Sequence, residues 1–222
     1  MTTTRKWADR STRSAHSSSW QASLDTTAGI ALVLAVAVSI RLLLAPKLGF
    51  YGDLRYFREW AGRLRVTGLG KFYAPGYFVD YPPGYLYVLS VLGRISSVPS
   101  YLLLKFPILL GDVALAWGSA LLASRFAPDQ LKRRIPVRAL VLLAVLFNPA
   151  VLGIGALWGQ VDSIPSALVI TTLVLILTGR RSHWRDLGGL CVFAVAIAIK
   201  PQSGFLAPVL AYLLIRRYLI TP

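Results

Sequence analysis

Long apolar runs recur along this chain, and they restrict its fold more than any other feature of the sequence. A helix needs about 20 apolar residues to cross a bilayer core of about 30 Å. Backbone polar groups inside a bilayer must be satisfied within the segment, so such runs form helices. The runs lie at 26–45, 101–123, 137–157, 164–177, 187–199 and 205–215. We therefore expect an all-α fold, a polytopic membrane helix bundle.

Clusters of basic residues indicate which side of the membrane each connection faces, because Lys and Arg are enriched in cytoplasmic loops. The clusters lie at 132–138, 180–185 and 216–217, and the N-terminal tail is basic too. Placing all of them inside predicts six spans within 26–222, a disordered cytoplasmic tail at 1–25 and one outer loop at 47–104. The short run from Tyr81 to Arg94 is then a re-entrant or juxtamembrane helix. A full crossing from Tyr81 to Val98 remains the alternative.

The net charge of +15 could indicate nucleic-acid binding, but the basic residues lie in short clusters between apolar runs. That distribution is typical of a membrane protein facing anionic lipid, so we expect no nucleic-acid partner. The sequence has no Cys/His cluster, Ser-His-Asp arrangement or glycine-rich phosphate loop. We expect no metal, no cofactor and no nucleotide-sugar donor.

Ionisable residues at membrane depth are costly, at about 2.5–3.5 kcal/mol each, and are usually kept for a function. Lys200 ends a short apolar run just before Pro201 and is predicted at the floor of a water-filled pocket, or else snorkelling at the interface. Lys105 and Asp112 are seven residues apart, so they share one helix face, and Asp112 is a candidate for a buried ion pair. Arg41 lies one turn from the end of its run and can snorkel.

Two further segments on the predicted outer side carry polar residues. Asp53 begins a segment with apolar residues at 54, 57, 60, 61 and 64, which predicts an amphipathic helix along the interface. Asp53 could be only the N-cap of that helix. The second segment, Trp-Gly-Gln-Val-Asp at 158–162, follows a predicted kink at Asn148-Pro149.

Four motifs in this order resemble those of the GT-C superfamily of glycosyltransferases. They are Gly52-Asp53 with Tyr56 and Trp60, Asp-Tyr-Pro-Pro at 80–83, Phe-Asn-Pro at 147–149 leading to 157–163, and Lys200-Pro201-Gln202. The second motif is similar to one shared by the endoplasmic-reticulum dolichyl-phosphate-glucose glucosyltransferases and bacterial family 87 mannosyltransferases. The third is most similar to the bacterial version.

The resemblance implies an inverting transfer of a hexose, with mannose favoured, from a polyprenyl-monophosphate donor to an acceptor hydroxyl outside the membrane. It implies Asp53 as the general base, since an attacking hydroxyl needs a carboxylate within hydrogen-bond reach. Cations must stabilise the leaving phosphate. The residues expected to bind donor phosphate or sugar are Lys105, Lys200, Gln202, Arg55, Arg58, Asp80, Tyr81, Trp158, Gln160 and Asp162.

Partners on this reading are the lipid-linked donor, a glycan, lipid or protein acceptor, and membrane lipids. The expected location is the bacterial cytoplasmic membrane with the site outside, or the endoplasmic reticulum in a eukaryote. Family members usually have more spans, so 26–222 would be the conserved module, with a second chain as a candidate source of further spans. The alternatives are a non-catalytic polyprenyl-phosphate-binding subunit or fragment, and a lipid or solute transporter. The sequence names neither the sugar nor the acceptor.

Overall fold

The computed structural model describes residues 24, 26–47, 49–179 and 181–220, and every regular element within them is helical. The tail predicted at 1–25 lies almost wholly outside these residues. The α-helices are α2 (Thr27–Leu44), α3 (Tyr51–Thr67), α4 (Pro83–Ile95), α5 (Tyr101–Phe126), α6 (Asp129–Arg134), α7 (Val137–Leu146), α8 (Pro149–Val151), α9 (Ser163–Leu177), α10 (His183–Ile199) and α11 (Ala207–Ile215). The 3₁₀ helices are η1 (Leu69–Lys71) and η3 (Pro201–Leu206), and the π-helical segments are η2 (Leu152–Trp158) and η4 (Arg216–Ile220).

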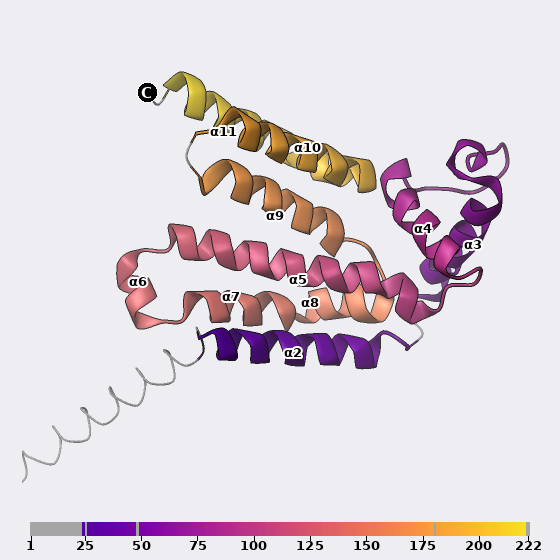
Figure 1. Cartoon of the computed structure of the whole chain (residues 1–222), viewed down its shortest axis with the longest axis horizontal. Helices are drawn as coiled ribbons and strands as arrows, with labels where there is room; N and C mark the ends of the chain where they lie inside the picture. Colours follow the sequence, from indigo (N-terminus) through magenta and orange to yellow (C-terminus); the bar gives the residue numbers. More distant parts are fainter. Residues whose placement is uncertain (1–23, 25, 48, 180, 221–222) are drawn as a thin grey trace, which may run out of the picture.

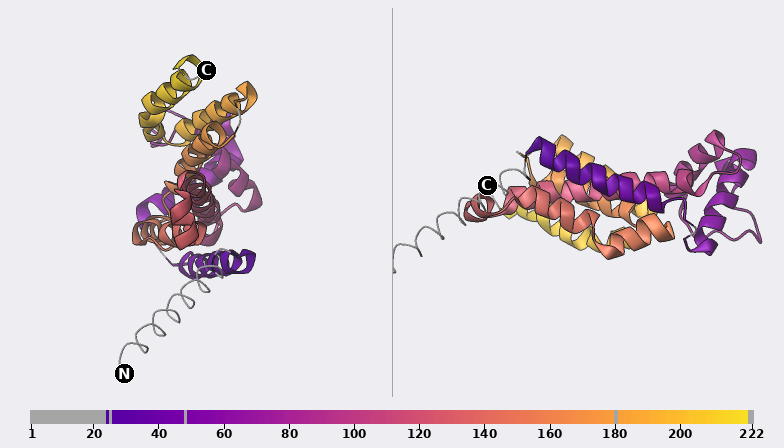
Figure 2. Two further views of the ribbon diagram at one scale, coloured as in Figure 1. Left: turned by 90° about the vertical axis from the view of Figure 1, so that its left-hand side faces the viewer. Right: turned by 90° about the horizontal axis from the view of Figure 1, so that it is seen from below.

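Most helices run along one common axis and form an elongated bundle. Figure 1 shows α2, α7 with α8, α5, α9, α10 and α11 side by side, while α3 and α4 lie together at one end. The same separation is visible from below in Figure 2. The helix α6, the C-terminal end of α9, the N-terminal end of α10 and η4 lie at the opposite end (Figure 1). The described residues of the basic clusters at 132–138, 181–185 and 216–217 are thus far from α3 and α4, while the membrane topology stays a prediction.

The helices α2, with 18 residues, and α5, with 26, are long and apolar enough to cross a membrane. The bent pair formed by α7 and the helical segment 149–158 is a third candidate, with an angle of 43° at its break. Asn148 forms this break by accepting a hydrogen bond from the Ala150 amide (2.8 Å) just before Pro149. The predicted all-α membrane bundle and the kink at Asn148-Pro149 are confirmed, while the number of six spans stays a prediction.

The apolar face of α3 is covered by protein. Leu54, Phe57, Trp60, Ala61 and Leu64 are each at most 2% exposed, and they pack in one core cluster with residues of α4. The spacing therefore predicted the helix correctly, but this face cannot lie on lipid. The close packing depends on Gly93, because a Cβ there would lie 2.2 Å from the carbonyl oxygen of Ala61.

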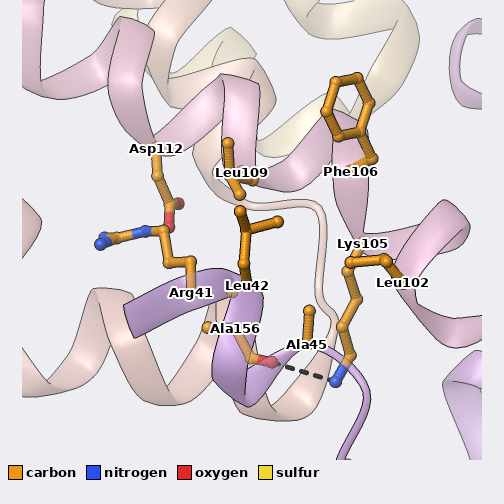
Figure 3. A pocket seen from close by; sticks show the side chains of 10 residues that line it. Arg41, Leu42, Ala45, Leu102, Lys105, Phe106, Leu109, Asp112 and Ala156 are labelled. Carbon is orange, nitrogen blue, oxygen red and sulfur yellow. Dashed lines mark hydrogen bonds and ion pairs between the residues drawn. The ribbon is translucent and has the colours of Figure 1, made fainter. Parts of the chain in front are cut away.

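A buried ion pair connects α2 to α5 within the bundle (Figure 3). Arg41 Nε donates to Asp112 Oδ2 at 2.7 Å, and both side chains are at most 2% exposed. A second nitrogen, Nη2, donates to the Leu146 carbonyl (2.9 Å), just before the Asn148-Pro149 break. The expectation that Arg41 snorkels is therefore wrong, and Asp112 has the ion-pair role, with Arg41 rather than Lys105 as its partner.

Replacing Arg41 with leucine alone is expected to lower the free energy of unfolding by about 3–5 kcal/mol, because Asp112 is left as an unpaired buried charge. The Arg41→Leu/Asp112→Leu double variant is expected to recover most of that loss. Denaturant unfolding of the purified chain in detergent checks both values. A double variant that is as unstable as the sum of the two single variants would contradict the account.

Candidate active site

A tight turn after η2 points two side chains of the 158–162 motif toward α3. Gly159 has φ = 91°, a conformation that favours glycine. A Cβ at Gly159 would also lie 2.6 Å from Leu54 Cδ2 of α3. Glycine is thus needed both for the turn and for its contact with α3, and this contact brings Trp158 and Gln160 to Asp53.

Asp53 lies in the first turn of α3 and is held by the turn just described. Its Oδ2 accepts a hydrogen bond from Trp158 Nε1 at 2.8 Å and another from Gln160 Nε2. The N-cap of α3 is Phe50, so the hypothesis that Asp53 is only the helix cap is wrong. Phe50 instead packs its ring 5.1 Å from that of Trp158. The sequence motifs at 52–53 and 158–162, far apart in the chain, therefore meet at one carboxylate.

Tyr81 links this carboxylate to the next part of the site. Its hydroxyl donates to Gln160 Oε1 at 3.1 Å, so the Gln160 amide bridges Tyr81 and Asp53. Burial raises the pKa of Tyr81, and the charges of Asp162, Asp53 and Asp80 raise it further. Tyr81 consequently stays protonated at neutral pH and keeps its donor role.

The start of α4 brings Tyr81 to the end of α10. A Cβ at Gly84 would lie 2.4 Å from the carbonyl oxygen of Ala198, so the Pro-Pro-Gly segment permits a close approach of the two backbones. Lys200 follows α10 directly, and its Nζ lies 5.9 Å from the centre of the Tyr81 ring. The same Nζ forms an ion pair with Asp162 Oδ1. The side chains of Lys200 and Asp162 are 20% and 47% exposed, so the pair is accessible.

Two open grooves meet at the Lys200–Gln202 segment. The lateral groove, with a volume of about 770 Å³, has Lys200 and Asp162 at one part and Leu115, Val169, Ile170 and Leu206 along its walls. The outer groove, with a volume of about 680 Å³, is lined by Tyr73, Asp80, Tyr81, Pro201, Gln202 and Phe205. Gln202 and Phe205 belong to both. The first groove is mostly apolar along its length, and the second has aromatic and polar walls.

Lys105 is buried and fully engaged, at 2% exposure. Its Nζ donates to the carbonyls of Lys47 (3.0 Å), Ala156 (3.0 Å) and Leu157 (2.9 Å), and Figure 3 shows the contact with Ala156. Two of these carbonyls are at the end of η2, where helical partners are missing. All three N–H donors of Lys105 are used by these carbonyls, so the geometry favours a structural role for Lys105, and its contact with the donor phosphate stays a prediction. Lys105 holds the turn that carries Trp158.

The two candidate arginines are also engaged elsewhere. Arg55 Nε pairs with the exposed Glu59 at 2.7 Å. Arg58 Nε donates to the Pro99 carbonyl (3.0 Å), and its guanidinium lies 4.3 Å from the centre of the Tyr101 ring. Arg58 thereby connects α3 to the start of α5.

Sequence reasoning missed Tyr73 as a candidate site residue. It lines the outer groove, and its hydroxyl donates to the Tyr81 carbonyl at 2.9 Å. The only signal was its place in an aromatic segment of the outer loop, Phe-Tyr-Ala-Pro-Gly-Tyr at 72–77.

The family model for glycosyltransferase family 87 matches residues 78–221. The matched region includes Tyr81, Trp158, Gln160, Asp162 and Lys200, and it begins after Asp53. No curated protein and no solved structure matches the chain.

Proposed function

The chain belongs to glycosyltransferase family 87, and from that premise we propose that it transfers a hexose, with mannose favoured, from a polyprenyl-monophosphate donor to an acceptor hydroxyl. We place the reaction on the outer face of the membrane, in bacteria the cytoplasmic membrane. Family membership makes the chain a membrane glycosyltransferase rather than a transporter. One observation carries the finer proposal: a chain of contacts links a hydrogen-bonded carboxylate to an accessible cation. Asp53 accepts from Gln160, Gln160 accepts from Tyr81, and the Tyr81 ring lies beside Lys200.

The donor fits the lateral groove in this proposal. Its polyprenyl chain lies along Leu115, Val169 and Ile170, which offer apolar surface, and its phosphate lies at Lys200. Gln202 lines the same groove and can donate to a phosphate oxygen through its amide. The donor phosphate competes with the Asp162 carboxylate for Lys200, because both are anions that bind the same ammonium group.

The chemistry is a single displacement at the anomeric carbon. The acceptor oxygen forms a bond to C1, the bond from C1 to the phosphate oxygen breaks, and the configuration at C1 inverts. Asp53 accepts the proton of the attacking hydroxyl, and polyprenyl monophosphate leaves with the electron pair of the broken bond. Lys200 stabilises the charge that grows on the phosphate. Trp158 and Gln160 orient Asp53 by binding one of its oxygens.

Replacing Lys200 with methionine is expected to weaken donor binding by about 10- to 100-fold, because a charged hydrogen bond contributes about 1.5–3 kcal/mol. Binding of radiolabelled polyprenyl-phosphate-mannose to the chain in nanodiscs measures the loss. Lys132→Met is the control, since Lys132 belongs to α6 at the other end of the bundle. Unchanged donor affinity in Lys200→Met would remove Lys200 from the phosphate site.

A further inference from the structure

The outer groove remains without a ligand once the donor is placed in the lateral groove. It shares only Gln202 and Phe205 with the lateral groove, and its other walls come from the segment before α4 and from Pro201. Its volume of about 680 Å³ is in the range of small-molecule sites. A second substrate can therefore occupy it while the donor is bound.

The residues that line this groove differ in kind from those of the lateral groove. Tyr73 is 52% exposed although its hydroxyl is fixed to the Tyr81 carbonyl, so a held aromatic side chain presents free surface. Asp80, which the resemblance assigned to the donor, lines this groove and not the lateral groove. It is exposed, and a carboxylate accepts hydrogen bonds from hydroxyl groups. Gln202 adds an amide that both donates and accepts.

We propose that the outer groove binds the acceptor and that this acceptor is a carbohydrate, with Tyr73 and Asp80 as residues that determine its specificity. A sugar ring offers one apolar C–H face to an aromatic side chain and hydroxyls around its edge to a carboxylate and an amide. A lipid alcohol would instead need a long apolar wall, such as the one that Leu115, Val169 and Ile170 give the lateral groove. The inference rests on the proposed function for the reaction that follows binding.

Tyr81 connects this groove to the proposed base. It lines the outer groove, and its hydroxyl is bonded to the Gln160 amide that also binds Asp53. A sugar hydroxyl that enters the groove beside Tyr81 thus approaches the carboxylate that takes its proton. The centre of the Tyr81 ring also lies 5.9 Å from Lys200 Nζ, so the outer groove and the proposed phosphate position both border Tyr81.

The test measures acceptor binding without turnover. The full chain in nanodiscs is titrated with three water-soluble methyl disaccharides, of mannose, glucose and arabinose, and with a serine-containing hexapeptide, by ligand-observed NMR. Saturable binding of at least one disaccharide is expected, with about tenfold weaker binding in Tyr73→Ala and in Asp80→Asn. Tyr87→Ala and Asp129→Asn are matched controls, because Tyr87 is 61% exposed on α4 and Asp129 lies in α6.

Wild-type disaccharide affinity in both groove variants would overturn the inference, as would binding of the peptide alone or of no probe. Labelled donor is titrated into the same preparations, and its affinity is expected to be unchanged in Tyr73→Ala and Asp80→Asn. If the wild type did not bind the labelled donor but bound a disaccharide that Tyr73→Ala and Asp80→Asn weaken, the proposed donor would be rejected and the acceptor site would stand. The failure of one proposal is thereby distinguished from the failure of the other.

Discussion

Replacing Asp53 with asparagine is expected to slow sugar transfer by roughly 10²–10⁴-fold, the contribution of a general base, while donor binding stays close to that of the wild type. The amide is nearly isosteric with the carboxylate. Its oxygen can still accept from Trp158 Nε1 or Gln160 Nε2, which donate to Asp53 Oδ2 in the structure. The substitution therefore removes the proton acceptor and leaves the fold of the turn in place.

The rate is measured as release of polyprenyl phosphate under single-turnover conditions, and the donor affinity is measured separately. Asp129→Asn is the control, since Asp129 is 88% exposed in its side chain and lies at the other end of the bundle. A rate within a factor of about three of the wild type in Asp53→Asn would exclude Asp53 as the base, since the expected loss is much larger.

Replacing Lys105 with methionine is expected to lower the free energy of unfolding by about 3 kcal/mol or more and to abolish transfer at the same time. Methionine fills a similar volume but leaves three carbonyls, those of Lys47, Ala156 and Leu157, without their donor. Buried acceptors without partners are costly. The turn that follows Leu157 is then no longer held against α3, and Trp158 and Gln160 lose their position at Asp53.

Denaturant unfolding in detergent gives the stability of this variant, and Lys71→Met, at an exposed position in η1, is the control. A direct phosphate ligand would behave differently from a residue that positions the turn. If Lys105→Met unfolded like the wild type and lost only donor binding, Lys105 would have to return to the phosphate site.

The sequence predicts which segments meet at the site but not every contact within it. Asp53, Tyr81, Gln160 and Lys200 come from separate motifs that were all predicted on the outer side, and the structure brings them together. Hydropathy and basic clusters suffice for this because they fix which ends of the helices share one side. They contain no information on which side chain contacts which.

The errors have physical causes in tertiary packing. Lys105 was expected at the donor phosphate and Arg41 at the membrane interface, because both lie near span ends. In the structure each binds carbonyls that are freed where a neighbouring helix ends or breaks. The breaks at Asn148-Pro149 and Gly159 can be recognised in the sequence, but the sequence does not show which helix packs against each break. The face of α3 was assigned to lipid for the same reason, since periodicity does not reveal that α4 covers it.

The most direct test of the central claim uses liposomes that contain the wild-type chain, polyprenyl-phosphate-mannose labelled in the sugar, and a crude acceptor lipid fraction. The account predicts that label moves to the acceptor with inverted anomeric configuration and that an equal amount of polyprenyl phosphate is released, with no nucleotide sugar present. Two results together would contradict the account: the label stays on the polyprenyl phosphate, and a labelled nucleotide sugar, supplied instead as the donor, does transfer its sugar to the acceptor.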